Sequence, residues 1–202
     1  MMEELLREME TYARTHHVPI LRTEERGAFV RILEAQHPKK ILEIGTAIGY
    51  SALLMALHGD AETRILSLER NEGRFTKARE FIDRSPYRDS IELRLGDAAK
   101  ELEGLEGPFD FVFLDGPKGQ YPRYFRQILP LLADRGAILA DNVLFRGLVD
   151  SEEKVPRRMR TIVKRLREYL RLLRKTPGFT TEILKIGDGM ALSRRLGYGE
   201  ET

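Results

Sequence analysis

The sequence predicts an α/β fold: a doubly wound, mostly parallel seven-stranded sheet with a C-terminal antiparallel hairpin. From Lys40 onward, short apolar runs alternate with longer stretches of helical periodicity, which is typical of parallel sheets. The run FDFVFLD at 109–115 is almost entirely apolar, as expected for a central buried strand. Near the end of the sequence, two strand-like runs flank Gly187-Asp188-Gly189, which indicates a hairpin.

The predicted elements follow one another in this order. The opening stretch is helical, and a second helix runs from Glu24 to Gln36, with Thr23 as its candidate N-cap. Five parallel strands are expected at Ile41–Ile44, Arg64–Leu68, Ile91–Leu95, Phe109–Leu114 and Ala137–Ala140. Helices are expected near 49–58, 71–84, 98–103 and 120–132. A basic amphipathic helix at 155–175 precedes the hairpin strands FTTEILKI and MALSRR.

Length and composition narrow the class of protein. The chain has 202 residues, of which 42% are hydrophobic and 33% charged, so we expect residues 1–202 to form a single folded domain. No run of eighteen apolar residues occurs, so we expect neither a transmembrane helix nor a membrane partner. Cysteine is absent, which excludes disulfides, thiolate zinc sites and cysteine nucleophiles and fits a reducing, cytoplasmic location.

The first chemically informative stretch is a glycine turn between a buried strand and a helix. It reads Ile41 to Ser51, with Gly45 and Gly49 in a G-x-x-x-G spacing. Glycines there let the backbone approach a ligand at the carboxyl end of the strand. The spacing differs from the dinucleotide pattern G-x-G-x-x-G, and a glycine turn alone can also be a tight connection.

Two acids at later strand ends make this turn more specific. Glu69 ends the second strand, where a carboxylate can accept hydrogen bonds from both hydroxyls of a ribose. Asp97 follows the third strand and could hold the amino group of an adenine. Taken singly, either acid could be a helix N-cap or a solvated loop residue. Three such features at successive strand ends indicate a cofactor that contains a nucleoside.

Oxygen ligands follow the fourth and fifth strands. Asp115 ends the fourth strand, and Asp141 and Asn142 end the fifth. Two carboxylates and an amide carbonyl are hard donors that suit Mg²⁺ or another hard divalent cation. Lys118 lies three residues beyond Asp115, where it could accept a proton from a substrate hydroxyl. A solvated loop lysine is the alternative interpretation, and the neighbouring oxygen ligands favour the catalytic one.

One segment is strongly basic, although the net charge of the chain is only +2. Residues 154–175 carry ten Lys or Arg and one acid, Glu168. Such a segment suggests a polyanionic partner, since a surface helix normally mixes charges of both signs. The alternative is the solvated face of an amphipathic helix. The candidate nucleic-acid-binding residues are Arg157, Arg158, Lys164, Arg165, Arg167, Arg171 and Arg174.

Five motifs occur in order: LEIGTAIGYSAL, LSLER, GDA, FDFVFLDGPKGQY and GAILADNVLFRG. They resemble those of the cation-dependent class I S-adenosylmethionine O-methyltransferases, which have a Rossmann-like fold and include the catechol and caffeoyl-CoA O-methyltransferases. The resemblance covers roughly residues 15–195. The form DGPKGQY, together with the basic helix, most resembles the bacterial tRNA 5-hydroxyuridine methyltransferase branch.

The resemblance implies a role for each motif residue. Glu43, Gly45 and Ser51 would line the methionine part of the cofactor, Glu69 the ribose, and Asp97 with Ala98 the adenine. Asp115, Asp141 and Asn142 would bind the metal, and Lys118 would be the catalytic base. The full predicted cofactor-binding set is Glu43, Gly45, Gly49, Ser51, Glu69, Asp97, Ala98 and Asp115. The family commonly dimerises, so we expect a homodimer with the N-terminal helices, 1–37, as a cap or dimer element.

The expected activity is Mg²⁺-dependent methyl transfer from S-adenosylmethionine to a hydroxyl oxygen. The expected acceptor is 5-hydroxyuridine at the tRNA wobble position, which would give 5-methoxyuridine. Gly116-Pro117 stands where the small-molecule members have bulkier residues, which makes catechols less favoured. The main alternative is a small-molecule catechol or phenol methyltransferase. The absence of G-x-G-x-x-G and the oxygen ligands Asp115, Asp141 and Asn142 argue against an NAD-dependent dehydrogenase. The same ligands and Lys118 argue against a nucleic-acid-binding module that keeps an inactive methyltransferase fold.

Overall fold

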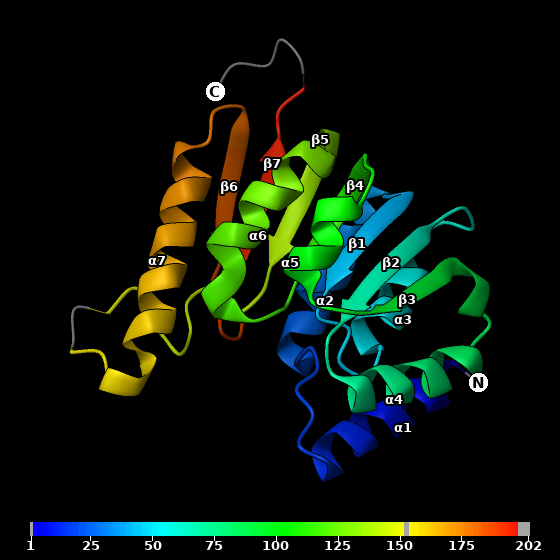
Figure 1. Cartoon of the computed structure of the whole chain (residues 1–202). Helices are drawn as coiled ribbons and strands as arrows, with labels where there is room; N and C mark the ends of the chain where they lie inside the picture. Colours follow the sequence, from blue (N-terminus) through cyan, green and yellow to red (C-terminus); the bar gives the residue numbers. More distant parts are fainter. Residues whose placement is uncertain (1, 152–153, 198–202) are drawn as a thin grey trace. The chain divides into compact units, whose positions relative to one another are not determined.

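The computed structural model describes residues 2–151 and 154–197 (Figure 1). It contains a seven-stranded sheet with a C-terminal antiparallel hairpin, which confirms the predicted fold class. The chain divides into two compact units, Met1–Glu101 and Leu102–Thr202, so the expected single domain stays a prediction. Among the described residues, no helix combines the length and apolar character needed to cross a membrane.

The first unit contains three parallel strands in the order β3-β2-β1. Its elements are α1 (Met2–Thr15), α2 (Thr23–Gln36), β1 (Lys40–Ile44), α3 (Tyr50–His58), β2 (Arg64–Glu69), α4 (Glu72–Asp83), the 3-10 turn η1 (Arg88–Ser90), β3 (Ile91–Leu95) and α5 (Ala98–Glu101). Ile44 pairs with Leu68 and Glu69 pairs with Leu95. The three strands therefore end at the same edge, and the residues that follow them emerge together.

The second unit contains the strand order β4-β5-β7-β6. Its elements are η2 (Leu102–Gly104), β4 (Phe109–Leu114), η3 (Lys118–Gln120), α6 (Tyr121–Ile128), η4 (Leu129–Leu131), β5 (Leu132–Ala140), η5 (Arg157–Met159), α7 (Arg160–Lys175), β6 (Phe179–Leu184) and β7 (Met190–Arg195). Strands β4 and β5 are parallel with Leu114 opposite Ala140, whereas β7 runs antiparallel to both β5 and β6. Helices α6 and α7 pack against each other (Figure 1).

The structure corrects the sequence interpretation at element ends. Strand β5 begins at Leu132 rather than Ala137, because a register shift lets Leu132 pair with Phe109 before the regular ladder starts. The helix predicted to reach residue 132 ends at Ile128 and continues as a 3-10 turn. Thr23 is the first residue of α2 rather than its N-cap, since the backbone N–H of Arg22 donates to the Glu25 carboxylate and fixes the start there.

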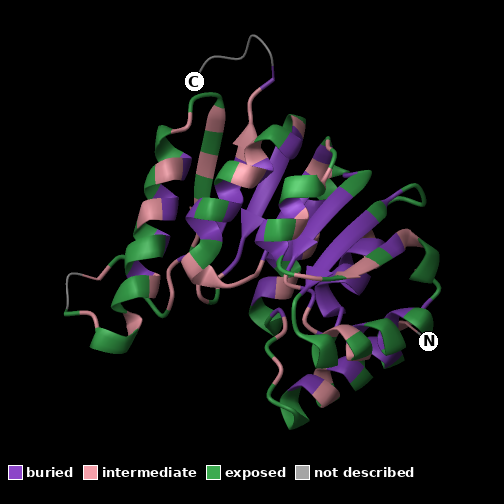
Figure 2. Cartoon of the chain, in the orientation of Figure 1, coloured by how far each residue is buried: buried purple, intermediate pink, exposed green. Residues whose placement is uncertain are grey.

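The core of each unit lies on its strands and on the inner faces of most helices, while α3 is buried on every side from Tyr50 to Ala56 (Figure 2). In β4, Phe109, Phe111 and Phe113 are all buried, as the apolar run predicted. Helix α7 buries the regularly spaced residues Val163, Leu166, Tyr169, Leu170 and Leu173. Its basic residues Lys164, Arg171 and Arg174 lie on the exposed side. Packing of α7 therefore depends on its apolar stripe and leaves these cations in solvent.

Two buried serines show how polar groups are accommodated inside the strands. Ser67 in β2 is fully buried; its hydroxyl donates to the carboxyl group of Glu43 and lies 2.5 Å from Thr46 Oγ1. Ser193 in β7 is equally buried, and its hydroxyl lies 2.9 Å from that of Thr181. Ser67 thus forms a hydrogen bond with an acidic side chain, and Ser193 forms one with a neutral side chain.

This difference predicts unequal stability losses for matched substitutions. Ser67→Ala should lower the free energy of unfolding by about 1–3 kcal/mol, because it removes a donor from a carboxyl oxygen of the fully buried Glu43. Ser193→Ala should cost only about 0.5–1.5 kcal/mol, the usual range for a neutral pair. Urea denaturation of both variants measures the difference. Equal losses would show that Glu43 does not depend on the Ser67 hydroxyl.

Candidate active site

The turn after β1 has an unusual backbone. Within residues 45–49, Gly45 (φ 103°), Ala47 (φ 49°) and Gly49 (φ 86°) all adopt positive φ angles. A Cβ atom on Gly49 would lie 3.1 Å from the Ile82 side chain of α4, so glycine also permits close packing there. Ala47 is the strained member, because an L side chain rarely adopts this conformation.

Glu69 holds this turn in place. One oxygen of its carboxylate accepts the Ala47 N–H at 2.9 Å, and the other accepts the Asn71 N–H at 2.8 Å. The carboxylate therefore links the turn after β1 to the turn after β2, which offsets the strain at Ala47. Two backbone donors occupy only part of the acceptor capacity of a carboxylate. Glu69 thus keeps lone pairs for ligand hydroxyls, as the ribose prediction requires.

Glu43 lies in β1, one residue before the strand ends, and is fully buried. The Ser51 and Ser67 hydroxyls donate to its two carboxyl oxygens, one to each. Ser51 is the second residue of α3, so this network joins β1, β2 and α3 under the glycine turn. Sequence reasoning picked out Glu43 and Ser51 but missed Ser67, whose signal was a serine inside an apolar strand.

Asp97 and Ala98 follow β3 at the same edge of the first unit. Asp97 is exposed, and its Oδ1 accepts the Ala99 N–H at 2.9 Å. Asp97 is therefore the N-cap of the short helix α5, which is the structural alternative that the sequence left open. Ala98 is buried. The first unit thus brings the predicted residues from the three strand ends to one edge.

The second unit brings Asp115 and Asp141 to the carboxyl ends of β4 and β5. The Asp141 N–H donates to the Leu114 carbonyl at 3.0 Å, which ties the two strand ends together. Asp141 is only 3% exposed, and its Oδ1 accepts the Asn142 N–H at 2.6 Å. Asn142 has φ 55°, so the chain turns sharply directly after the strand.

Lys118 and Asp115 form a close, partly buried ion pair. Lys118 Nζ lies 2.5 Å from Asp115 Oδ1, and the two side chains are 17% and 26% exposed. Lys118 belongs to η3, the short turn after β4, which returns its ammonium group to the strand end. The structure therefore places the predicted base directly beside a predicted metal ligand.

Tyr121 is the residue of this unit that sequence reasoning missed. It is fully buried, and its hydroxyl lies 3.0 Å from the carbonyl oxygens of both Leu114 and Asp141. Burial, followed by the negative charges of Asp115 and Asp141, raises the pKa of Tyr121 well above its usual value. The signal in the sequence was its place at the end of the DGPKGQY motif.

The donor set at β4 and β5 fits a hard divalent cation by its chemistry. It offers two carboxylates and one amide carbonyl, and a cation such as Mg²⁺ commonly keeps several water ligands. Over residues 2–151 and 154–197, no three His, Cys, Asp or Glu side chains gather as a metal site. A cation held here would therefore need the Asn142 carbonyl and waters in addition to the two acids.

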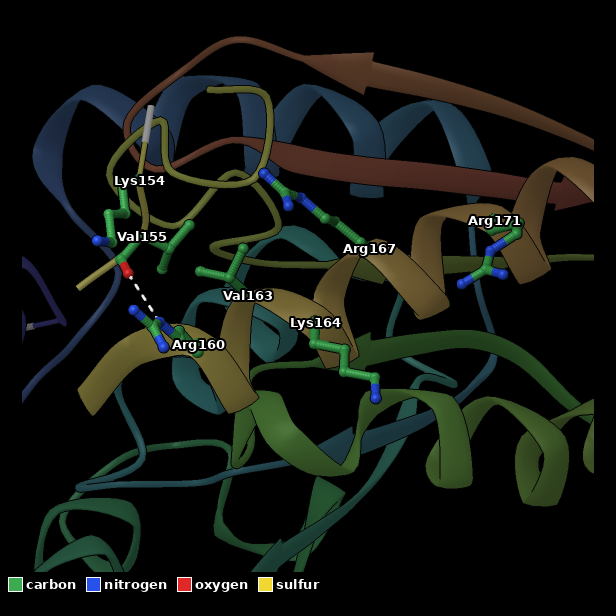
Figure 3. Close-up of a pocket in the computed structure, with 7 residues that line it drawn as sticks. All are labelled: Lys154, Val155, Arg160, Val163, Lys164, Arg167 and Arg171. Atoms are coloured by element: carbon green, nitrogen blue, oxygen red, sulfur yellow. Dashed lines mark hydrogen bonds between the residues drawn. The ribbon is translucent and has the colours of Figure 1, made fainter. Parts of the chain in front are cut away.

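The basic helix α7 borders two hollows. One has a volume of about 480 Å³ and is lined by Lys154, Val155, Arg160, Val163, Lys164, Arg167 and Arg171 (Figure 3). The other, of about 410 Å³, is lined by Val149, Asp150, Arg167, Leu170, Arg171, Arg174 and Lys175. Five of the seven residues around the first hollow are cationic. Lys154 and Arg160 were outside the predicted nucleic-acid-binding set.

Not every cation of that set is equally available to a partner. The guanidinium of Arg167 donates to the carbonyls of Leu148, Val149 and Ser151, at 2.9–3.2 Å, and so anchors the loop before α7. Arg165 pairs with Glu168 at 2.8 Å, and Arg126 of α6 pairs with the same acid. Lys164, Arg171 and Arg174 are exposed and therefore better placed to meet a partner.

Comparison with known proteins identifies the family. The O-methyltransferase family model matches residues 1–196. Caffeoyl-CoA O-methyltransferase from Populus kitakamiensis is 30% identical over 180 residues, which cover 85% of this chain and 77% of that protein.

Solved structures extend the similarity to three dimensions. A candidate caffeoyl-CoA O-methyltransferase from Staphylococcus aureus has a TM-score of 0.87 at 30% identity, with 94% of this chain and 91% of the other covered. An O-methyltransferase from Bacillus cereus, solved in complex with SAH, has a TM-score of 0.84 at 27% identity, with 95% and 90% covered. Nearly the whole chain thus matches in sequence and in fold, and it belongs to the S-adenosylmethionine-dependent O-methyltransferases.

Proposed function

We propose that this chain transfers a methyl group from S-adenosylmethionine to 5-hydroxyuridine at the tRNA wobble position, with the help of Mg²⁺ or another hard divalent cation. The observation that carries the proposal is the pairing of Lys118 with Asp115 beside Asp141, at the ends of two adjacent parallel strands. We further propose a cytoplasmic homodimer of single-domain chains, with the N-terminal helices at 1–37 as a cap or dimer element.

In this proposal the first unit binds the cofactor. Glu69 accepts the ribose hydroxyls with the acceptor capacity that Ala47 and Asn71 leave unused. The positive φ angles of Gly45 and Gly49 keep side chains out of the turn, so that its backbone can face the ligand. Glu43 and Ser51 stabilise the turn from below and line the methionine part. Asp97 and Ala98 border the adenine.

The second unit prepares the acceptor. When bound, S-adenosylmethionine supplies the methyl group, and a divalent cation supplies positive charge beside the acceptor oxygen. Asp115, Asp141 and Asn142 would hold the cation, whose positive charge would favour the neutral amine form of Lys118, and that amine would accept the proton of the acceptor hydroxyl. The ion pair with Asp115 holds Lys118 in position before the acceptor arrives. The enzyme then contributes mainly by aligning the reactants.

The choice of tRNA rests on chemistry and charge. A 5-hydroxyuridine carries O4 and the 5-hydroxyl oxygen on adjacent carbons, so it offers the same chelating pair as a catechol. Lys164, Arg171 and Arg174 lie exposed along α7, where RNA phosphates would neutralise them. The predicted cations Arg157 and Arg158 lie exposed in η5, directly before this helix.

A small-molecule acceptor is the second candidate, favoured by the relative named as a caffeoyl-CoA O-methyltransferase. The deciding experiment incubates the protein with labelled S-adenosylmethionine, Mg²⁺ and, in parallel, bulk tRNA, catechol and caffeoyl-CoA. Mass spectrometry of the tRNA nucleosides should reveal 5-methoxyuridine. Transfer to catechol or caffeoyl-CoA with none to tRNA would overturn the proposed acceptor and leave the methyltransferase activity standing.

The first functional prediction concerns the cation. Asp141→Ala should abolish methyl transfer and leave the affinity for S-adenosylmethionine nearly unchanged, because the metal contacts the acceptor rather than the cofactor. Adding EDTA to the wild type should have the same effect, and excess Mg²⁺ should restore activity. Calorimetry with the cofactor and a radiolabel transfer assay measure the two quantities. Full activity in EDTA would remove the cation from the mechanism.

The second concerns the base. Lys118→Ala should lower kcat by roughly 10²–10⁴-fold, the usual contribution of a positioned general base. Lys118→Arg is the matched control, because arginine keeps the positive charge beside Asp115 but does not give up its proton in proteins. Both variants should lose kcat in steady-state assays with saturating cofactor. A Lys118→Arg enzyme with wild-type kcat would assign the lysine to charge alone.

The third concerns the exposed cations of α7. Changing Lys164, Arg171 and Arg174 together to Glu should raise KM for tRNA by at least about tenfold. The salt dependence of binding should become less steep, because fewer phosphate contacts release fewer counterions from the RNA. Methylation of free 5-hydroxyuridine nucleoside should change little.

The matched control reverses the same number of charges on the first unit, outside the N-terminal helices, at the exposed residues Arg74, Arg79 and Arg88. This control should leave KM for tRNA near the wild-type value. If both triple variants weaken tRNA binding equally, α7 is not the RNA contact surface.

A further inference from the structure

Two buried tyrosines meet beneath the strand ends of the second unit. The Tyr121 and Tyr169 rings lie edge to face, with centroids 5.3 Å apart. Both side chains are fully buried. Their hydroxyl groups nevertheless have opposite surroundings. The Tyr121 hydroxyl lies within 3.0 Å of two backbone carbonyls, whereas in the part of the chain that the structure describes the Tyr169 hydroxyl has no hydrogen-bond partner.

The two carbonyls beside Tyr121 belong to the residues that end β4 and follow β5. Leu114 directly precedes Asp115, and Asp141 is itself a proposed metal ligand. The Leu114 carbonyl also accepts the Asp141 N–H, at 3.0 Å. Three groups therefore form a closed triangle: the Leu114 carbonyl, the Asp141 backbone and the Tyr121 hydroxyl. A phenol has one proton, which the two carbonyls at equal distance share.

The ring of the same tyrosine supports the lysine. Lys118 Nζ lies 5.5 Å from the centroid of the Tyr121 ring, within the range of a cation–π interaction. Tyr121 is also the first residue of α6 and directly follows the turn that carries Lys118. One side chain thus contacts the backbone at both acidic strand ends and the amine between them.

We propose that Tyr121 is a positioning residue for the acceptor end of the site, and that its hydroxyl and its ring fix the positions of Asp115, Asp141 and Lys118 relative to one another. This inference rests on the proposed function, which assigns the metal and the proton transfer to those three residues. Residues that orient the ligands of a metal typically change its affinity by about 10–100-fold when they are lost, without touching the metal themselves. Tyr121 would act on Asp141 in this way, because its hydroxyl contacts the Asp141 backbone carbonyl.

Tyr169 provides the matched control. Tyr121→Phe and Tyr169→Phe each remove one oxygen atom from a fully buried ring, and the two rings contact each other. Only the first removes a hydrogen bond. Removing an unpartnered buried hydroxyl should leave stability unchanged or raise it, because that group lost water without gaining a partner.

The first measurement uses the protein without metal or cofactor. NMR amide exchange should show the Asp141 amide exchanging as slowly as the β5 amides in the wild type and at least about tenfold faster in Tyr121→Phe. Tyr169→Phe should keep the wild-type rate. Exchange of the wild-type Asp141 amide at the rate of an open loop would overturn the proposal, whether or not the Tyr121→Phe protein folds.

The second measurement titrates each protein with Mn²⁺ and, separately, with S-adenosylmethionine. Tyr121→Phe should weaken Mn²⁺ binding by about tenfold and leave cofactor affinity unchanged, while Tyr169→Phe should change neither. Equal effects of the two variants on Mn²⁺ would mean that general packing, and not the hydroxyl, sets the geometry. If the wild type binds no Mn²⁺, the proposed function fails, and the exchange experiment still decides whether Tyr121 ties the strand ends together.

Discussion

Parallel strands that are buried along their length place their polar chemistry at their ends, and this constraint organises both units. In β4 the residues from Phe111 to Leu114 are buried and Asp110, near the start of the strand, is partly exposed, so the acid at the carboxyl end is Asp115, directly after the strand. Glu43 is an acid inside a strand, and its burial has to be compensated by hydrogen bonds. Its buried carboxyl group requires hydroxyl donors from Ser51 and Ser67.

Each unit ties its strand ends together by a different device. In the first, the Glu69 carboxylate accepts backbone N–H groups from two successive turns, which holds the strained Ala47 in place. In the second, backbone and tyrosine hydroxyl groups close the gap between β4 and β5. The charged side chains left at the two edges differ accordingly. The first unit presents a partly satisfied carboxylate, and the second presents an acid paired with a lysine.

Helix α7 serves two purposes through its two faces. Its apolar face buries Val163, Leu166 and Tyr169, and Tyr169 reaches the ring of Tyr121 beneath the acidic strand ends. The opposite face exposes cations that the packing does not require. Arg167 belongs to neither group, because three loop carbonyls take up its guanidinium. The exposed cations Lys164, Arg171 and Arg174 fit the proposed acceptor, which is part of a polyanion.

The sequence by itself determined the fold class, most strand bounds and the candidate site, because these depend on local patterns. Apolar runs mark buried strands, and polar residues directly after them mark strand ends, so Glu69, Asp115 and Asp141 were readable without a structure. Tertiary structure decided what depends on residues distant in the chain. Arg167 anchors the Val149 carbonyl 18 residues away, and Tyr121 meets the Asp141 carbonyl 20 residues away. No local pattern records these contacts, since they exist only once separate elements have packed together.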